Sequence, residues 1–538
     1  TSSLAANTTG ASNSAFGANT LAANTTASNN TAMGYNAGTA ITTGTENTVV
    51  GALAGDAITT GNENTAVGKT ALSADTKGHR SVAIGQGTLA TQNFTSSTNS
   101  YNTAVGFQAG NAVTTGTLNT FIGANSGDAV TTGGQNTALG QNSLGSNTTA
   151  SNNTAIGYVA LVANTTGASN VAVGASSLDA NTEGSNNTGV GFNALTSNTT
   201  AAGNTAVGYN SLAANTTGAS NTAVGSGALD ASTTGASNVA VGLNSMTSNT
   251  NGYENTAVGK DSLASCTEGF ENTAIGHNCG AAITTGDNNT FVGNAAGQAN
   301  TTAGANTAVG NAALASNTTG ATNNAFGANA LDACTTGARN NGFGYRALAS
   351  ATTGYYNTAI GHQAGDDITD GFKNICIGHD ADISAGNNQH TIVIGESITA
   401  ASNDFSFGKA SNVVTNDFDA DANWSRSSDE RLKKNITNQT LGLDFINDLR
   451  TVKYNWKPSN ELDSTDSQLA HLYKENADDN EMNTSAVMHN FIAQEVKAAL
   501  DTAGVSEFGG WKEDQYGVQQ VSREMFVIPL VKAVQELS

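Results

Sequence analysis

Large apolar residues recur along the first 395 residues at a fixed interval. They belong to a phrase, Asn-Thr-Ala-Val-Gly, whose copies begin every 17 residues from Asn13 to Thr391. The 23 copies keep this spacing except for a four-residue insertion before Asn102. A fixed period of this kind indicates a repeat architecture. Seventeen residues are too few for two strands and a helix, so the pattern predicts a parallel β-solenoid in which each coil carries two short strands.

Each position of the phrase suggests a physical role; positions are numbered 1 to 17 from its first residue. Position 1 is Asn in 21 of the 23 copies, and stacked Asn side chains can form amide ladders. Position 3 is small and position 4 is always large and apolar, as in Phe16 and Val292. Position 5 is Gly in every copy, which suits a corner that needs positive φ or close backbone approach.

Positions 9 and 12 vary together. Leu or Met at position 9 never occurs with a large apolar residue at position 12, whereas Gly at position 9 is followed by Ile or Val. We infer that the two positions fill one shared pocket from either side. Examples are Leu21 with Asn24 and Gly38 with Ile41, and the exception is Gly297 with Asn300.

The rod is expected to be long and thin and to associate with other copies of the chain. No proline occurs before residue 428, in keeping with ladder hydrogen bonding throughout. Twenty-two steps of about 4.8 Å give a rod of about 105 Å. One coil offers about two large apolar residues in 17, so the solenoid gains from association, and we expect a homotrimer.

The repeat resembles the head repeats of YadA-like trimeric adhesins over roughly residues 1–400. The phrase itself, with Ala-Leu and Thr-Thr-Gly later in each coil, carries the resemblance. It implies left-handed parallel β-rolls arranged as trimers. Similar repeats occur in bacteriophage tail fibres. The period here is longer than that of the adhesins.

Composition changes sharply near residue 428. Residues 1–427 carry 24 acidic and 9 basic side chains, while the shorter segment 428–538 carries 18 and 11, and both prolines. We therefore expect a solenoid over 1–395, a degenerate last repeat and connector or tip over 396–427, and a separate domain over 428–538.

The last domain has an α+β pattern. Residues 440–450 have helical apolar spacing, and Val452, Tyr454 and Trp456 alternate like a strand. A second helix is expected over 494–500. Ser522 is expected to cap a final helix that Pro529 kinks.

This domain resembles the endosialidase-type intramolecular chaperone family. The matching segments are Ser-Asp-Glu-Arg-Leu-Lys-Lys-Asn-Ile from Ser428, the stretch 449–456, Phe-Ile-Ala-Gln-Glu-Val over 491–496, and the stretch 528–537. In that family Ser-Asp-x-Arg-x-Lys marks an autoproteolytic site. The resemblance implies a cut between Ser427 and Ser428, with Ser428 as nucleophile, Lys433 as base and Asp429 in an orienting role.

The implied pair is chemically sensible, because a serine hydroxyl needs a nearby base. A lysine serves only when neutral, and we expect burial and the like charges of Arg431 and Lys434 to favour that form. A regular helix would place residues 428 and 433 about 140° apart. We therefore expect a turn here, or a pair assembled across subunits. The plain alternative is a charged linker.

Other features exclude or weaken several classes of function. The net charge of −22 argues against nucleic-acid binding. No apolar run suits a membrane span, and no secretion signal is visible. Cys266, Cys279, Cys334 and Cys376 form no CxxC pair, so neither zinc nor a disulfide framework is expected.

Rings recur at position 6 of several coils. A stripe of exposed rings suits receptor glycans, but packing at a turn or subunit contact is the favoured interpretation. We expect no metal and no cofactor, although three of these side chains are histidines. They are Tyr35, Phe107, Tyr158, Phe192, Tyr209, His277, Tyr345, His362 and His379.

The function indicated is that of a homotrimeric attachment fibre of a virion tail, binding a host receptor or glycan. Its N-terminus is expected to join other tail components, and a piece may precede Thr1 in the natural protein. Self-cleavage is the one enzymatic step expected. The alternatives are a bacterial trimeric surface adhesin, an ice-binding solenoid suggested by the Thr-Thr columns, and a polysaccharide depolymerase, for which no acidic pair recurs in the rod.

Overall fold

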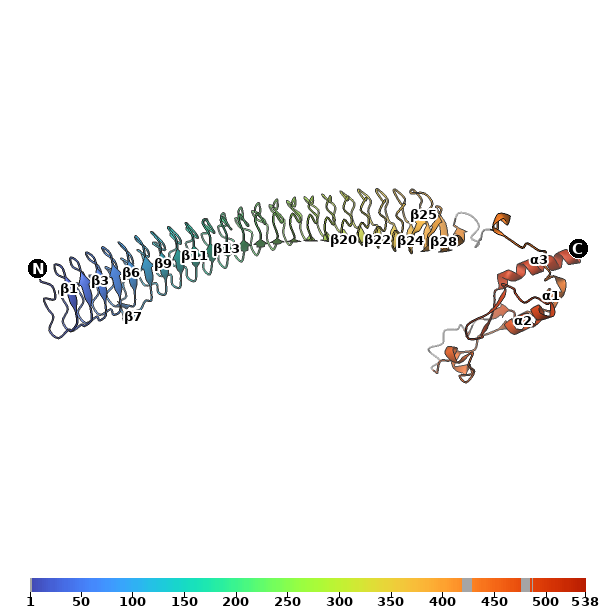
Figure 1. Ribbon diagram of the computed structural model, residues 1–538, viewed down its shortest axis with the longest axis horizontal. Helices are drawn as coiled ribbons and strands as arrows, with labels where there is room; N and C mark the ends of the chain where they lie inside the picture. Colours follow the sequence, from blue (N-terminus) through green and yellow to red (C-terminus); the bar gives the residue numbers. More distant parts are fainter. Residues whose placement is uncertain (1, 419–427, 476–483, 486) are drawn as a thin grey trace. The chain divides into compact units, whose positions relative to one another are not determined.

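The computed structural model describes residues 2–418, 428–475, 484–485 and 487–538. The chain forms two compact units, Thr1–Arg426 and Ser427–Ser538. The first unit is mostly β and the second is a small domain with few helices (Figure 1). Ser427, half of the expected cleavage site, lies outside the described residues.

The first unit is a parallel β-solenoid of 17-residue coils, as predicted. It runs as a long, gently curved rod (Figure 1). Each coil places positions 2–4 in a strand, and each strand pairs in parallel with its equivalent in the next coil, as Ala206 does with Ala223. The strands are β1 Ser14–Phe16, β2 Thr31–Met33, β3 Thr48–Val50, β4 Thr65–Val67, β6 Val82–Ile84, β8 Thr103–Val105, β9 Thr120–Ile122, β10 Thr137–Leu139, β11 Thr154–Ile156, β12 Val171–Val173, β13 Thr188–Val190, β14 Thr205–Val207, β15 Thr222–Val224, β16 Val239–Val241, β17 Thr256–Val258, β18 Thr273–Ile275, β19 Thr290–Val292, β20 Thr307–Val309, β21 Asn324–Phe326, β22 Asn341–Phe343, β23 Thr358–Ile360, β24 Ile375–Ile377 and β26 Ile392–Glu396.

Most coils hold one strand rather than the two expected. Residues with positive φ at positions 7 and 9, such as Asn210 and Leu212 at 52°, bend the rest of the coil into turns. These turns still stack through backbone hydrogen bonds, since Leu212 N donates to Ala228 O at 3.0 Å. Second strands occur at the insertion, β5 Gly78–His79 with β7 Thr98–Asn99, and at β25 Ala381–Ile383 with β27 Ile398–Ala400.

Strand alternation decides which apolar residues form the core. The position-3 side chain, usually Ala, points inward and is buried from Ala32 to Val393. None of the 23 position-4 side chains is buried. The large apolar residue at position 4 therefore points outward, while the one at position 9 or 12, such as Leu21 or Ile41, is buried.

Asparagine at position 1 links neighbouring coils through side-chain hydrogen bonds. Asn204 Nδ2 donates to Gly218 O at 2.9 Å, and Asn204 Oδ1 accepts from Asn221 N at 2.8 Å. Amide-to-amide bonds also occur, as from Asn47 Nδ2 to Asn30 Oδ1 at 3.1 Å. The predicted ladder is present, but most of its bonds run from side chain to backbone.

Where the ladder lacks its asparagine, the position-12 side chain of the same coil takes over its hydrogen bonds. Ser81 replaces Asn at position 1, and Gln92 reaches into the gap. Gln92 Nε2 donates to Ser81 Oγ at 2.8 Å and to Asp75 Oδ2 at 2.6 Å, while Gln92 Oε1 accepts from Asn102 Nδ2 at 2.8 Å. The irregular coil thus keeps its buried polar atoms paired.

The shared pocket behind positions 9 and 12 has the predicted form. A Cβ placed on Gly38 would lie 2.9 Å from Ile41 Cδ1 and 3.0 Å from Leu21 Cδ2. The Ile of one type of coil thus fills the space that Leu takes in the other. In the coil of the exception, Phe291 at position 3 packs against position 9, since its ring would lie 2.5 Å from a Cβ on Gly297. The same contact between Phe121 and Gly127 occurs with Val130 at position 12, so it does not explain Asn300.

The invariant glycines turn a corner at which coils nearly touch. Gly34 has φ of 132°, and a Cβ there would lie 2.6 Å from Gly51 O. Both predicted reasons for glycine, positive φ and close approach, therefore apply together.

The solenoid ends in a hairpin. Strand β28, Asp404–Lys409, still pairs in parallel with β26, but β29, Asn412–Asp417, turns back antiparallel to β28. These are the last strands of the 25-stranded sheet. The antiparallel strand replaces the next coil, so the repeat stops here.

The second unit packs three helices and two small sheets around six buried residues. The core comprises Leu441, Phe445, Val496, Ala499, Leu500 and Phe526. The helices are α1 Leu443–Asn447, α2 Ala493–Thr502 and α3 Val527–Leu537, and the strands are β30 Val452–Tyr454 with β31 Met488–Asn490 and β32 Trp511–Glu513 with β33 Gln519–Val521. Short 3₁₀ turns are η1 Glu430–Leu432, η2 Ser459–Glu461, η3 Ala470–Leu472 and η5 Arg523–Phe526.

The predicted helices and first strand are present with shifted ends. The first helix is shorter than expected, and the strand stops before Trp456. Ser522 does not cap α3; it precedes η5 and donates to Glu524 Oε2 at 3.2 Å. Pro529 does not kink α3, because it lies in the first turn, where its missing N–H is not needed.

The described helices include none with the length and apolar character to cross a lipid bilayer.

Candidate functional site

A single 3₁₀ turn brings the predicted nucleophile and base together. Residues Glu430–Leu432 form the turn η1, flanked by extended backbone at Asp429 and Lys433. Lys433 Nζ donates to Ser428 Oγ at 2.6 Å within one chain. Of the two arrangements expected, this is the turn rather than an assembly across subunits.

Asp429 holds the turn instead of contacting the pair. Its Oδ1 accepts from Arg431 N at 2.9 Å, and Arg431 Nη2 donates to its Oδ2 at 2.6 Å. The hydrogen bonds from the Arg431 side chain lower the pKa of the Asp429 carboxyl. The carboxylate can therefore position the turn without competing for the Lys433 ammonium.

The expected burial of Lys433 is absent in the single chain. Ser428, Lys433 and Lys434 are all exposed. An exposed lysine keeps the water that stabilises its charge. The geometry of a serine–lysine pair is present, but the dry surroundings that would activate the lysine are not.

An apolar stripe of position-4 side chains follows the solenoid sheet on its outer face. It includes Val207 at 37% exposed, Val224 at 36% and Ile275 at 41%. The rings of Phe326 and Phe343 stack in this stripe with centroids 4.9 Å apart. Contiguous apolar surface of this extent marks an interaction face.

Helix α3 presents a second apolar face. Its exposed apolar side chains are Val527 at 55%, Ile528 at 59%, Leu530 at 51%, Val531 at 48%, Val534 at 57% and Leu537 at 71%. Residues 527, 530, 534 and 537 follow spacings of three, four and three, as in the seam of a coiled coil. The opposite side of α3 packs inward through Pro529 and Ala533.

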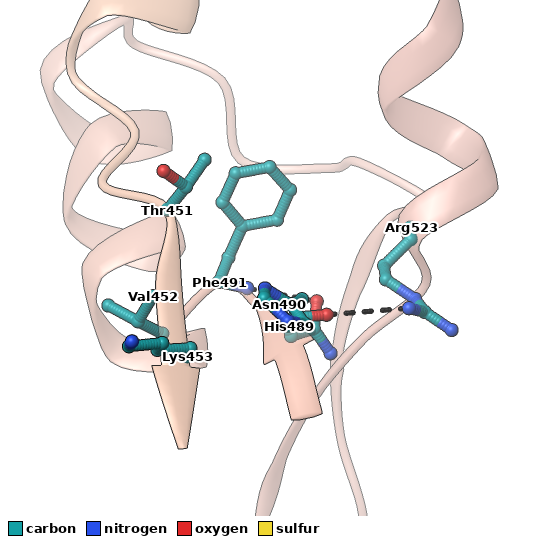
Figure 2. Close-up of a pocket in the computed structure, with 7 residues that line it drawn as sticks. All are labelled: Thr451, Val452, Lys453, His489, Asn490, Phe491 and Arg523. Atoms are coloured by element: carbon teal, nitrogen blue, oxygen red, sulfur yellow. Dashed lines mark hydrogen bonds between the residues drawn. The ribbon is translucent and has the colours of Figure 1, made fainter. Parts of the chain in front are cut away.

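A pocket of about 430 Å³ opens beside β30 and β31 (Figure 2). Lys453 and Arg523 lie on opposite sides of it, and Arg523 Nη1 donates to His489 O at 3.4 Å. The seven lining residues are Thr451, Val452, Lys453, His489, Asn490, Phe491 and Arg523, which include no carboxylate. The pocket is thus cationic and lacks an acid–base pair.

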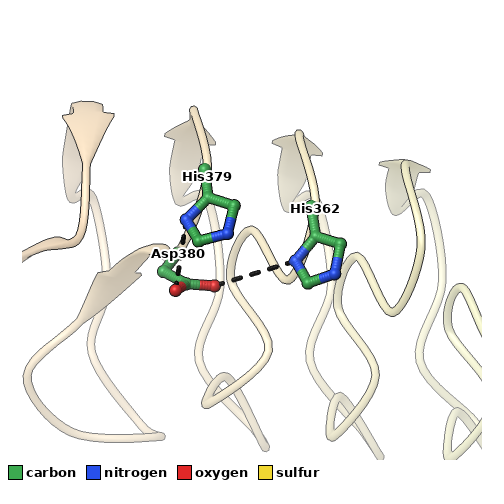
Figure 3. Close-up of side chains that lie close together, drawn as sticks. All are labelled: His362, His379 and Asp380. Carbon is green, nitrogen blue, oxygen red and sulfur yellow. Dashed lines mark ion pairs between the residues drawn. The ribbon is translucent and has the colours of Figure 1, made fainter.

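The rings at position 6 stack where adjacent coils both carry one. Phe192 and Tyr209 have centroids 5.7 Å apart, and Tyr345 and His362 have centroids 5.2 Å apart. His362 continues to His379 at 5.0 Å, and both imidazoles face Asp380 (Figure 3). The histidines share position 6 of the repeat and could be grouped from the sequence, whereas Asp380, at position 7 beside them, was not predicted to join them.

The hydroxyl groups of the threonine columns are less available for outside hydrogen bonds than the sequence suggests. At position 13, Thr199 Oγ1 donates to Thr216 O at 3.2 Å, and the same bond recurs in neighbouring coils. A hydroxyl that donates to the next coil along the rod is not free to donate elsewhere. This disfavours the two-column face that an ice-binding solenoid would present.

Comparison with known proteins identifies one family. Residues 428–505 match the sequence profile of the family described as chaperone of endosialidase. The match begins at Ser428 and includes η1, α1 and α2 but not α3. Neither curated proteins nor solved structures gave a match to the chain. The resemblance seen in the sequence is thus borne out for the C-terminal domain.

Proposed function

We propose that the chain is a homotrimeric attachment fibre whose C-terminal domain directs trimeric folding and then cleaves itself off. The observation that carries the proposal is the match to chaperone of endosialidase over residues 428–505, directly following a long β-solenoid. The setting would be a virion tail, with a bacterial cell surface as the alternative.

The trimer is supported by two apolar surfaces that a single chain leaves open. The position-4 stripe runs along the solenoid, so three rods packed about a common axis would cover it in every coil. Burying a Val side chain contributes about 1.5 kcal/mol or more, and the stripe repeats over 23 coils. Even partial burial per coil would hold the fibre together.

The C-terminal domain would assemble through α3. Six of its described residues form the buried core cluster, which is small for a domain of this size. Three copies of α3 meeting along Val527, Leu530, Val534 and Leu537 would add a shared core. Val534→Glu would weaken this assembly, whereas Gln535→Glu, an exposed residue about 100° away around the same helix, serves as its control.

A folding role follows from the repeat itself. Identical coils allow neighbouring chains to slip by a whole coil, because every register buries the same side chains. A domain that trimerises first would align three chains before their solenoids wind. Cleavage afterwards would remove the return path and leave the fibre kinetically trapped.

Self-cleavage would use the Ser428–Lys433 pair. With Lys433 neutral, its Nζ accepts the Ser428 hydroxyl proton as Oγ attacks the carbonyl carbon of Ser427. The bond from that carbon to Ser428 N breaks, and the nitrogen takes the proton from Lys433. The resulting ester between Ser427 and Ser428 Oγ is hydrolysed by water, which restores the hydroxyl and leaves a carboxylate on Ser427.

Activation would depend on assembly. Since Lys433 is exposed in the single chain, a neighbouring subunit covering the turn would supply the desolvation that favours neutral lysine. Cleavage would then be delayed until the trimer exists, which is the order that the folding role requires.

The test is expression of the full chain followed by mass measurement and light scattering. We expect a released fragment of residues 428–538 and a trimeric solenoid. Ser428→Ala and Lys433→Ala should give an uncleaved trimer, and Lys457→Ala, an exposed lysine outside the turn, is the matched control that should cleave. Cleavage that persists in Ser428→Ala would rule out this nucleophile, and a monomeric wild-type chain would rule out the fibre.

Receptor binding is the remaining part of the proposal. The stacked rings at position 6, such as Phe192 with Tyr209, give flat apolar surfaces that suit sugar rings. Binding of the cleaved trimer to a glycan array, lost in Tyr209→Ala, would support attachment through this stripe. Release of sugar from the host capsule would instead indicate a depolymerase.

A further inference from the structure

Three side chains near the C-terminal end of the solenoid converge through two ion-pair contacts, with no hydrogen bond among the three in the described part of the chain. His362 Nδ1 lies 3.9 Å from Asp380 Oδ1, and His379 Nδ1 lies 3.2 Å from Asp380 Oδ2. The three ligand atoms all lie within 4.8 Å of one another. Figure 3 shows both imidazoles turned toward the carboxylate between two coils.

A second observation, at the Asp380 carboxylate, also points to a bound cation. Asp380 Oδ1 is closed off from solvent and accepts no hydrogen bond from the described residues. A carboxylate oxygen in that position is costly unless a positive group faces it. Its backbone is fixed, because Asp380 N donates to His362 O at 3.0 Å and Asp380 has φ of 48°.

We propose that His362, His379 and Asp380 bind a divalent transition-metal ion, with Zn²⁺ as the expected occupant. Two imidazoles and one carboxylate favour Zn²⁺, Ni²⁺ or Cu²⁺ over Mg²⁺ or Ca²⁺, which prefer oxygen ligands. Ligand atoms of a tetrahedral zinc are about 3.3 Å apart. The two nitrogen-to-carboxylate separations are 3.2 and 3.9 Å and all three ligand atoms lie within 4.8 Å of one another, so side-chain rotations would bring them to this distance.

The site is open on its outer side, so water would complete the coordination. All three side chains are 42–54% exposed, which gives the ion a direct entry path. Binding should weaken in acid, because an imidazole nitrogen must be unprotonated to bind a metal.

The ion would clamp two coils together. His362 belongs to the coil that begins at Asn357, and His379 and Asp380 belong to the next, which begins at Asn374. Only one further coil and the β28–β29 hairpin follow. Stacked repeats open from their ends, so a cross-link here would hold the end of the rod closed.

The chain provides a matched control at the same position of another coil. His277 also occupies position 6, but its Nδ1 lies 3.1 Å from Asn294 Nδ2, and the next coil supplies no second imidazole. His277→Ala removes an equivalent ring without touching the proposed site.

The experiment is a calorimetric titration of the full chain with ZnCl₂ at pH 7.5, repeated for each variant. The wild type and His277→Ala should bind one Zn²⁺ per chain that His379→Ala and Asp380→Asn do not bind. On zinc addition, hydrogen exchange of residues 357–391 should slow in the wild type and in His277→Ala, but not in His379→Ala or Asp380→Asn. Equal zinc stoichiometry in the wild type and His379→Ala, or unchanged exchange, would overturn the proposal. Should His379→Ala fold poorly, His362→Gln gives the same comparison.

Discussion

Asn221 donates its backbone N–H to the side-chain oxygen of Asn204, 17 residues earlier, at 2.8 Å. Asn204 Nδ2 in turn donates to Gly218 O at 2.9 Å. One side chain thus satisfies an acceptor near the end of its own coil and a donor of the following coil, and both are buried inside the rod. Position 1 is therefore a cross-brace between coils rather than a simple stack of amides.

Asn204→Ala should destabilise the rod locally. The change leaves Asn221 N buried without this partner, while Gly218 O keeps the hydrogen bond from Asn215 Nδ2 at 3.0 Å, so the cost should be roughly 1–3 kcal/mol. Hydrogen exchange of residues 204–222 should rise strongly, while distant coils change little, because repeats contact only their neighbours. Thr200→Ala, an exposed residue in the adjoining coil, should leave exchange unchanged. A uniform rise along the whole rod would contradict this local role.

The pocket behind positions 9 and 12 predicts a compensating pair. Gly365→Leu places a Cβ 3.2 Å from Ile368 Cδ1 and 3.1 Å from Leu348 Cδ2, so it overfills the coil. The cost should be about 1–3 kcal/mol. The backbone is no obstacle, because Leu348 holds the same position with φ of 58°.

Adding Ile368→Asn to Gly365→Leu should restore most of the lost stability, since this recreates the other natural coil type. Thermal unfolding of the single and double variants makes the comparison. A double variant less stable than Gly365→Leu alone would show that the two positions do not share one space.

The repeat made the solenoid predictable, because its period, invariant glycine and paired positions 9 and 12 each reflect a constraint that acts within one or two coils. The outward direction of position 4 was within reach as well. Ala206 and Val207 are neighbours on one strand, and strand alternation sends them to opposite faces.

Other features depended on distances that a linear pattern does not contain. The turn at Glu430–Leu432 sets the 2.6 Å contact of Lys433 with Ser428, and a five-residue spacing alone allowed several geometries. Asp380 was not predicted, because it lies in the coil after that of His362 and at position 7 of the repeat rather than position 6. The spacing of three, four and three residues already indicates an apolar face on α3. The predicted kink at Pro529 would have interrupted this face, so the face was not predicted.

Charges on the apolar stripe should dissociate the proposed trimer without unfolding the coil. Val207→Glu with Val224→Glu replaces two outward side chains that are 37% and 36% exposed. A single rod tolerates them, but burying them between subunits costs several kcal/mol. Light scattering should report a monomer with an unchanged far-ultraviolet circular dichroism spectrum.

Thr200→Glu with Thr217→Glu is the matched control, because it adds the same charges one coil apart on another exposed column. That variant should remain trimeric. Equal dissociation by both pairs would indicate a general charge effect rather than a specific face.

Asp382 should make the end of the solenoid sensitive to pH. Burial raises the pKa of its carboxyl to about 7, although Asp367 N and Ile383 N donate to it at 2.9 and 2.7 Å. A raised pKa means that the folded chain holds the proton more tightly than the unfolded chain. The associated stability is present in full below the ordinary carboxyl range and is lost as pH rises through about 7.

Hydrogen exchange of residues 366–391, corrected for its intrinsic pH dependence, should therefore be faster at pH 8 than at pH 5, on the order of tenfold. Asp382→Asn should be less protected overall, since an amide offers one acceptor oxygen to the two backbone donors, but its protection should not change between these pH values. Glu183→Gln, an exposed residue far along the rod, should keep the wild-type response. A wild-type chain whose protection rises with pH would reverse the sign and exclude Asp382 as the cause.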